Sequence, residues 1–474
     1  MAQTNTGRVT PPIYTHEGGT ADRTTPLQAL RRSVMSCFLW EKEFYEDGVE
    51  IATRIGTLAE QVTPVELAHL AVEARTRFYL RHVPLFLLAK LAKTGSGTSI
   101  LKDTIPLVIR RADELAEFVA IFWQLNPGKD ITNQMKKGLR TALLNFDEYE
   151  LAKYDRDKPV KTRDVAFLAH VKGIGNDHNR LIARMVNKNY FPEKTKSAQF
   201  PVRELFNVPE DTPGLASPDT WEVALSAGEN KKETFERLLA EGKLPYFALI
   251  RNLRNMAGAG CEPEAIKAAI VARKGARFIL PFRYVAAARA APMFEPALDQ
   301  ALLASLGDMM QLKGTTIVLT DVSDSMNAKL SQKGDLKRMD AAATLASIVP
   351  AEKLRSFTFS NVLVEVPPRK GMSGVDAITK SQPHGGTYLA QAINGIHMLN
   401  IPYDRLIITT DEQIHPGRLP EPRGKFNYVI NVASNKNGIG YRKPWIHIDG
   451  FSENIFRFIG EVETERPLDA LRGK

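Results

Sequence analysis

Two kinds of hydrophobic pattern follow one another along the chain. Up to about residue 300, apolar residues recur at helical spacing, as at Leu30, Val34 and Phe38. Beyond residue 313, short unbroken runs of apolar and β-branched residues, such as 316–319, alternate with helical segments. Unbroken runs of this kind are typical of strands buried on both faces of a parallel sheet. The sequence therefore predicts an α-helical region followed by an α/β domain with a doubly wound sheet.

Helix starts in the first region recur at nearly equal intervals. The sequences TPLQ at 25–28 and TPVE at 63–66 are both capping boxes with proline at the first helical position, and they lie 38 residues apart. A polar break at 94–103 follows at a similar distance, and a helix is expected at 107–122. A period of about 40 residues is typical of HEAT-like helical repeats.

The domain boundaries follow from these patterns. Residues 1–22, which contain Pro11, Pro12, Gly18 and Gly19, are expected to form an extended or loose N-terminal arm. Residues 23–305 form the predicted helical-repeat region, and 313–474 form the α/β domain.

Composition places the chain among ordinary globular proteins. It has 474 residues, 43% hydrophobic and 25% charged, which suits two or three domains. Its two cysteines, Cys37 and Cys261, form no C-x-x-C pair, so neither a disulfide framework nor a cysteine-rich zinc site is indicated. No apolar signal core and no run long enough to span a bilayer occurs. A cytoplasmic protein without membrane contact is expected.

The net charge of +9 is concentrated in one stretch. Residues 129–203 hold 16 Lys and Arg against 9 Asp and Glu, with aromatic residues such as Tyr149 and Tyr154 between them. Cations near stackable rings suit the binding of single-stranded nucleic acid. A solvated basic helix face with core aromatics is the alternative. The basic candidates are Lys136, Lys137, Arg140, Lys153, Arg156, Lys161 and Arg163.

Candidate metal ligands follow the first predicted strand of the α/β domain. Asp321, Ser323 and Ser325 form the pattern D-x-S-x-S on a turn. A carboxylate with two hydroxyls is a set of hard oxygen ligands, which favours Mg²⁺ or Mn²⁺ over zinc. Taken alone, the pattern also fits an ordinary turn, because Asp and Ser often bond their own backbone there.

Two further segments favour the metal interpretation. Thr387 follows Gly385 and Gly386 just before a predicted helix, and Asp411 follows a predicted strand at 406–409. In an open α/β sheet, ligands bind where loops leave the carboxyl ends of the strands, so these side chains are expected to meet. With only two aspartates at the site, binding is favoured over two-metal catalysis, which uses clustered carboxylates.

These five residues resemble the metal-ion-dependent adhesion site of von Willebrand factor A domains. The resemblance implies a divalent ion, Mg²⁺ or Mn²⁺, held mainly by Ser323, Ser325 and Thr387, with Asp321 and Asp411 bound directly or through water. It also implies one open coordination position for an acidic group of a protein partner.

Three segments of the helical region also resemble a known module. They are RRSVMSCFLWEKEFYEDG, LAKYDRDKPVKTRDVAFLAHVKG and WEVALSAGENKKETFERLLAEGKLPYFALIRNLRNM. These segments resemble the TROVE module of the Ro autoantigen family, particularly its bacterial members, which also carry a C-terminal von Willebrand A domain. The resemblance extends over nearly the whole chain from about residue 13.

This resemblance implies a function. Ro-type proteins form a closed ring of helical repeats that binds Y-like non-coding RNA outside and the single-stranded 3′ ends of misfolded RNAs in its central hole. Lys153 and His170 stand at positions similar to family RNA contacts. A monomeric, non-catalytic RNA-binding protein of RNA quality control is expected, with an exoribonuclease such as polynucleotide phosphorylase as a partner. A metal-dependent protein-interaction scaffold without an RNA role is the alternative.

Overall fold

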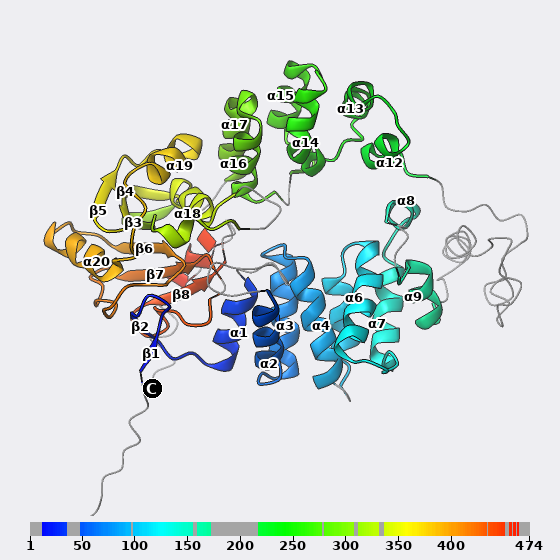
Figure 1. Cartoon of the computed structure of the whole chain (residues 1–474), viewed down its shortest axis with the longest axis horizontal. Coiled ribbons are helices and arrows are strands. Elements are labelled where there is room, and N and C mark those ends of the chain that lie inside the picture. The colour runs from blue at the N-terminus through cyan, green and yellow to red at the C-terminus, as the bar shows by residue number, and fades with distance from the viewer. Residues whose placement is uncertain are drawn as a thin grey trace, which may run out of the picture. The chain divides into compact units, whose positions relative to one another are not determined.

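The chain forms two compact units. The computed structural model describes residues 12–35, 48–95, 98–154, 159–171, 217–276, 279–307, 311–330, 336–433, 435–450, 455–456, 458–460 and 462–463. One unit comprises Gly56–Ala248 and Asn255–Ile266. The other comprises Met1–Ile55, Leu249–Arg254 and Lys267–Lys474, so it combines an N-terminal segment, which includes α1, with the region of the large sheet (Figure 1).

The first unit contains a two-layer stack of helices. The helices of this stack are α3 (Pro64–Thr76), α4 (His82–Thr94), α5 (Ile100–Val108), α6 (Ala112–Leu125), α7 (Asn133–Leu143), α8 (Glu148–Lys153) and α9 (Thr162–Leu168). Helix α3 packs on α5 and α5 on α7, whereas α4 packs on α6, and α6 on α8 and α9 (Figure 1). This alternation is the packing of a helical-repeat array, and it confirms the predicted fold class.

The single helix predicted at 107–122 is wrong, because the chain turns at 109–111 between α5 and α6. The buried carboxylate of Glu114 accepts hydrogen bonds from the backbone amides of Arg110 (2.9 Å) and Arg111 (3.2 Å). It also pairs with Arg75 of α3 at 2.8 Å. These contacts cap α6 at its first turn and fix the break.

The remaining helices are α1 (Pro26–Met35), α2 (Gly48–Ala59), α12 (Trp221–Ser226), α13 (Lys231–Ala240), α14 (Tyr246–Gly258), α15 (Pro263–Ala272), α16 (Pro281–Ala290) and α17 (Glu295–Ser305). Trp221 stacks on Phe235, with ring centroids 6.2 Å apart, and so joins α12 to α13. None of the described helices combines the length and the apolar composition needed to cross a bilayer.

The second unit contains a six-stranded, mostly parallel sheet. Its strands are β3 (Leu312–Asp321), β4 (Ala351–Phe359), β5 (Leu363–Val366), β6 (Arg405–Thr410), β7 (Phe426–Asn431) and β8 (Ile446–Asp449), in the order β5-β4-β3-β6-β7-β8. Only β5 is antiparallel to its neighbour. Helices α18 (Arg338–Ser347), α19 (Gly371–Thr379) and α20 (Leu389–Met398) complete the predicted doubly wound fold.

Two buried layers enclose this sheet. Ile317 and Leu319 of β3 pack in one cluster with Ile393 of α20. Helix α18, which is buried along its whole length, packs on β3 and β6. Because β3 and β6 are parallel neighbours, their carboxyl ends lie at the same edge of the sheet.

Helices α16 and α17 belong to the same compact unit as the sheet, although the prediction assigned residues up to 305 to the helical region. Arg289 of α16 forms an ion pair with Asp340 of α18 at 2.6 Å. Asp299 of α17 accepts a hydrogen bond from the backbone amide of Met372, in the first turn of α19, at 2.8 Å. These polar contacts join the last two predicted repeat helices to the α/β fold.

The N-terminal segment also belongs to this unit. Strands β1 (Ile13–Tyr14) and β2 (Thr20–Ala21) pair with each other, and the backbone amides of Gly19 and Thr20 donate to the carbonyls of Ile414 (3.0 Å) and Gly417 (2.9 Å). A side chain at position 19 would collide with Ile414, so glycine is required there. Residues 12–22, for which an extended or loose arm was predicted, thus include two short strands held against residues 414–417, and residues 1–11 lie outside the described part of the chain.

We predict that Gly138→Ala destabilises the helical stack, because a Cβ at this position of α7 would lie 2.7 Å from Ile105 of α5. The loss expected from such overpacking is about 1–3 kcal/mol. Gly258→Ala is the matched control, since nothing lies within 4 Å of a Cβ built there. Urea denaturation of both variants measures the difference. Equal stabilities would contradict the close approach of α5 and α7.

Candidate functional site

The candidate metal site begins with Asp321, the last residue of β3. Its side chain is fully buried. The backbone amide of Ser323 donates to Oδ1 of Asp321 at 2.9 Å, and the Thr410 hydroxyl donates to Oδ2 at 2.5 Å. Because Thr410 ends β6, the Asp321 carboxylate bridges the ends of two adjacent parallel strands.

The two serines follow in the turn after β3. Ser323 and Ser325 are both buried, and their hydroxyl oxygens lie 3.3 Å apart. The backbone amide of Asp324 donates to the carbonyl of Gly385 at 2.9 Å, so this turn is held against the loop that carries Thr387. Thr387 is buried, and its carbonyl accepts the amide of His415 at 3.0 Å. All three predicted segments are therefore joined at one edge of the sheet.

Asp411, directly after β6, is the second buried carboxylate of the site. Its Oδ1 accepts the backbone amide of Gln413 at 3.2 Å, and its Oδ2 lies 3.3 Å from Nη1 of Arg338. Burial, and then the negative charge of Asp411, raise the pKa of Asp321 to about 7. Arg338 is a buried cation beside the site that the sequence prediction missed.

The donor set fits a hard divalent cation. Two buried carboxylates repel one another, and the three hydroxyls offer neutral oxygen ligands of the type that Mg²⁺ accepts. Within the described residues, no three His, Cys, Asp or Glu side chains are arranged to hold a metal ion. An ion at this edge would therefore depend on the hydroxyls of Ser323, Ser325 and Thr387.

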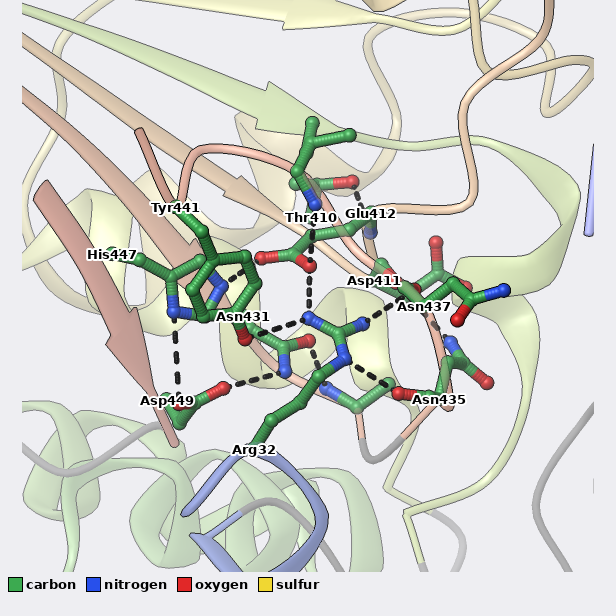
Figure 2. A network of polar contacts seen from close by, with 12 residues as sticks. Arg32, Thr410, Asp411, Glu412, Asn431, Asn435, Asn437, Tyr441, His447 and Asp449 are labelled. Atoms are coloured by element: carbon green, nitrogen blue, oxygen red, sulfur yellow. Dashed lines mark hydrogen bonds and ion pairs between the residues drawn. The ribbon is translucent and has the colours of Figure 1, made fainter. Parts of the chain in front are cut away.

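A second buried polar network lies directly beside Asp411 (Figure 2). Its centre is Glu412, whose carboxylate is paired with Arg32 of α1 on one oxygen and with His447 of β8 on the other. Arg32 also donates from Nη2 to the carbonyl of Asn437 at 3.0 Å. His447 lies 3.6 Å from Asp449 and stacks on Tyr441, with ring centroids 3.8 Å apart.

The charges of this network balance. Burial alone lowers the pKa of His447, but the carboxylates of Glu412 and Asp449 outweigh that effect and raise it to about 9. Two cations, Arg32 and protonated His447, thus face two carboxylates. Sequence reasoning missed all four residues, because Arg32 and Glu412 are 380 positions apart and no local motif marks either of them.

The basic candidates lie in the first unit. Lys153, at the end of α8, places Nζ 5.6 Å from the ring centroid of Tyr149 and 5.8 Å from that of Tyr154. Arg111, which precedes α6, lies over the Tyr154 ring at 4.5 Å. Arg111 was not among the predicted residues, because it precedes the basic stretch and joins it only through packing.

Other candidates lie on α7 and α9. Arg140 donates from Nη2 to the carbonyl of Ala169 at 3.0 Å, next to the exposed His170. His170 has a left-handed φ of 50° at the end of α9. The remaining candidates are the half-buried Lys136, Lys161 and Arg163, and the exposed Lys137. Arg156 lies outside the described residues.

Comparisons with known proteins agree with this architecture. The TROVE domain family model matches residues 213–276, which include α12 to α15. The solved structure of the Ro (Rsr) protein of Deinococcus radiodurans is similar over 90% of this chain and 97% of its own, with a TM-score of 0.55 and 17% identity. Telomerase protein component 1 of Mus musculus is 46% identical over 46 residues, which are 10% of this chain and 2% of that protein's length.

The fold is that of a helical-repeat region combined with an α/β domain whose six-stranded sheet is mostly parallel. Residues 213–276 match the TROVE domain family model, and the chain shares its fold with a solved Ro protein.

We predict that His447 makes stability depend on pH. Its pKa is raised from 6.5 to about 9 in the folded protein, so its stabilisation is complete below about pH 6.5 and is lost as the pH rises through 9. The loss amounts to at most about 3 kcal/mol. Urea unfolding from pH 6 to 10 should give a flatter profile for His447→Gln than for the wild type. The control His69→Gln, at an exposed position of α3, should keep the wild-type profile. Identical profiles for His447→Gln and wild type would refute the assignment.

Proposed function

We propose that this protein is a non-catalytic RNA-binding protein of the Ro type. The observation that carries the proposal is the TROVE match at 213–276 within a chain that shares its two-part fold with a solved Ro protein. The basic excess in residues 129–203 gives independent support, because phosphate binding requires such charge. Its RNAs would be Y-like non-coding RNA and the single-stranded 3′ ends of misfolded RNAs.

The side chains around Lys153 support this assignment chemically. Tyr149 exposes 44% of its surface and lies beside the Lys153 ammonium. An exposed ring with an adjacent cation suits a stacked base whose phosphate is neutralised by the lysine. His170, exposed at the end of α9, offers a second ring for stacking.

The metal site would serve a partner rather than a reaction. Asp321, Ser323, Ser325, Thr387 and Asp411 would hold a Mg²⁺ or Mn²⁺ ion, which would supply Lewis-acidic binding of an external carboxylate. Because only two of these five residues are carboxylates, an ion bound there would keep affinity for a further anion. The protein would act in the cytoplasm as a monomer, in RNA quality control or as an adaptor for an exoribonuclease such as polynucleotide phosphorylase.

A metal-dependent protein-interaction scaffold is the second candidate. The observation that favours it is that all five candidate ligands are buried on three segments joined by hydrogen bonds, whereas the described RNA candidates are dispersed between residues 136 and 170. RNA affinity and its salt dependence distinguish the two candidates.

We predict that the protein binds an RNA hairpin with a single-stranded 3′ tail more tightly than the same hairpin without a tail. Its affinity should fall steeply with salt, with a log–log slope of about −0.7 for each phosphate neutralised on a single strand. Fluorescence anisotropy at several salt concentrations measures both quantities. If neither RNA binds at low salt, the scaffold function is favoured instead.

The pair of changes Lys153→Ala and His170→Ala should weaken binding of the tailed RNA by about tenfold or more, since loss of a stacking or phosphate contact costs about 1–3 kcal/mol. Lys380→Ala is the matched control, because Lys380 is a highly exposed lysine of the α/β domain. Equal affinities for both variants would remove Lys153 and His170 from the RNA site.

The metal assignment has its own test. Ser323→Ala combined with Asp411→Ala should abolish Mg²⁺ and Mn²⁺ binding in calorimetric titrations while RNA affinity stays within about threefold, as expected for independent sites. Circular dichroism checks that the variant is folded. Undiminished ion binding by the folded variant would show that the ion is held elsewhere.

A further inference from the structure

Glu412 has an unusual backbone conformation. Its φ is +63°, in the left-handed region that non-glycine residues seldom adopt. It directly follows Asp411, so the same peptide that is held in this conformation also sets the direction of the Asp411 carboxylate. A conformation of this kind persists only where the surroundings enforce it, and it costs about 1–3 kcal/mol.

Side-chain contacts of Glu412 enforce this conformation (Figure 2). The carboxylate pairs with Arg32 and with His447, and its Oε2 accepts the backbone amide of Ile439 at 3.3 Å. Both carboxylate oxygens are therefore engaged, and the Glu412 side chain is fully buried. It cannot move without breaking an ion pair inside the protein.

Of the residues labelled in Figure 2, Arg32 alone belongs to helix α1. Its side chain is fully buried. Its guanidinium donates to the carbonyls of Asn435 (2.5 Å) and Asn437 (3.0 Å) and contacts the Tyr441 hydroxyl at 3.3 Å. Arg32 therefore joins two segments, the turn after β6 and the loop after β7.

The absence of a side chain at Gly438 leaves the space that the Arg32–Glu412 ion pair occupies. A Cβ at position 438 would lie 2.0 Å from Oε2 of Glu412 and 2.2 Å from Nη1 of Arg32. Any larger residue would displace the pair. In addition, Asn435 donates from Nδ2 to the carbonyl of Asp411 itself at 3.2 Å, so the segment bound by Arg32 also touches the candidate metal ligand.

We propose that Arg32 is a positioning residue of the divalent-cation site. By holding Glu412 and the 435–437 segment, it fixes the backbone of Asp411 in the conformation that suits ion binding. Docking of α1 and binding of the ion are then coupled, and the coupling acts in both directions. The inference rests on the metal site proposed above.

A matched control for Arg32 exists at the start of β6, the strand that Asp411 and Glu412 follow. Arg405, the first residue of β6, is also fully buried and forms an ion pair with Glu463. Loss of either arginine removes an ion-pair partner from a carboxylate, the fully buried Glu412 or the half-buried Glu463, and so destabilises the fold. Of these two arginines, only Arg32 contacts Glu412, the residue that follows Asp411.

The test is Mn²⁺ titration of the full-length wild type, Arg32→Met and Arg405→Met, followed by calorimetry, with thermal unfolding of each without the ion. We expect both variants to lose stability, but only Arg32→Met to bind Mn²⁺ about tenfold or more weakly, within the usual range of coupling between sites. Arg32→Lys should restore part of the affinity. Equal Mn²⁺ affinity for Arg32→Met and Arg405→Met would overturn the proposal, whereas a wild type that fails to bind Mn²⁺ would overturn the metal site itself.

Two further measurements apply if Arg32→Met does not fold. Tyr441→Phe removes one hydrogen bond of Arg32 and should lower Mn²⁺ affinity by about twofold, as suits a partial loss of coupling. In the wild type, Mn²⁺ should slow amide hydrogen exchange in residues 26–35 while leaving α4 unchanged. Exchange in 26–35 that is insensitive to Mn²⁺, in a wild type that binds the ion, would likewise overturn the coupling.

Discussion

The burial of two carboxylates at the ends of adjacent parallel strands is the constraint on which this α/β domain depends. Asp321 and Asp411 are both fully buried, and like charges in such a place are unfavourable unless they are compensated. Compensation comes from the Thr410 hydroxyl, from the amides of Ser323 and Gln413, and from Arg338. The polar composition of this edge is thus a consequence of where the strands end.

The same constraint explains why distant parts of the chain are integrated here. Next to Asp411, Glu412 adds a third buried negative charge, and its partner Arg32 comes from the N-terminal helix. Asp340 lies on α18, two residues after Arg338. It pairs with Arg289 of α16. The first helix and one of the last helices before the sheet are therefore both bound through arginine to the elements that surround the site.

The sequence allowed the fold class and the candidate ligands to be predicted because both leave local patterns. Unbroken apolar runs mark parallel strands, and D-x-S-x-S and Asp411 each follow such a run, whereas Thr387 follows a Gly-Gly pair just before a predicted helix. The turn at 109–111 was missed because the apolar residues on either side of it keep helical spacing. The turn depends on hydrogen bonds from the amides of Arg110 and Arg111 to the Glu114 carboxylate. The roles of Arg32 and His447 were missed because buried ion pairs between distant residues have no sequence signature. The packing of residues 12–22 was missed for a similar reason, since its partners are carbonyl groups in loops.

The contacts of the N-terminal segment have a consequence for the order of events during synthesis. Thr15 and Arg32 leave the ribosome early, but their partners at Ile414 and Glu412 are made about 400 residues later. At typical elongation rates this interval is about 20 to 80 s. The helical stack, built from neighbouring helices, has all its contacts available before then. The two compact units thus differ in when they can be completed, because Thr15 and Arg32 can make these contacts only after residues 412–414 have been synthesised.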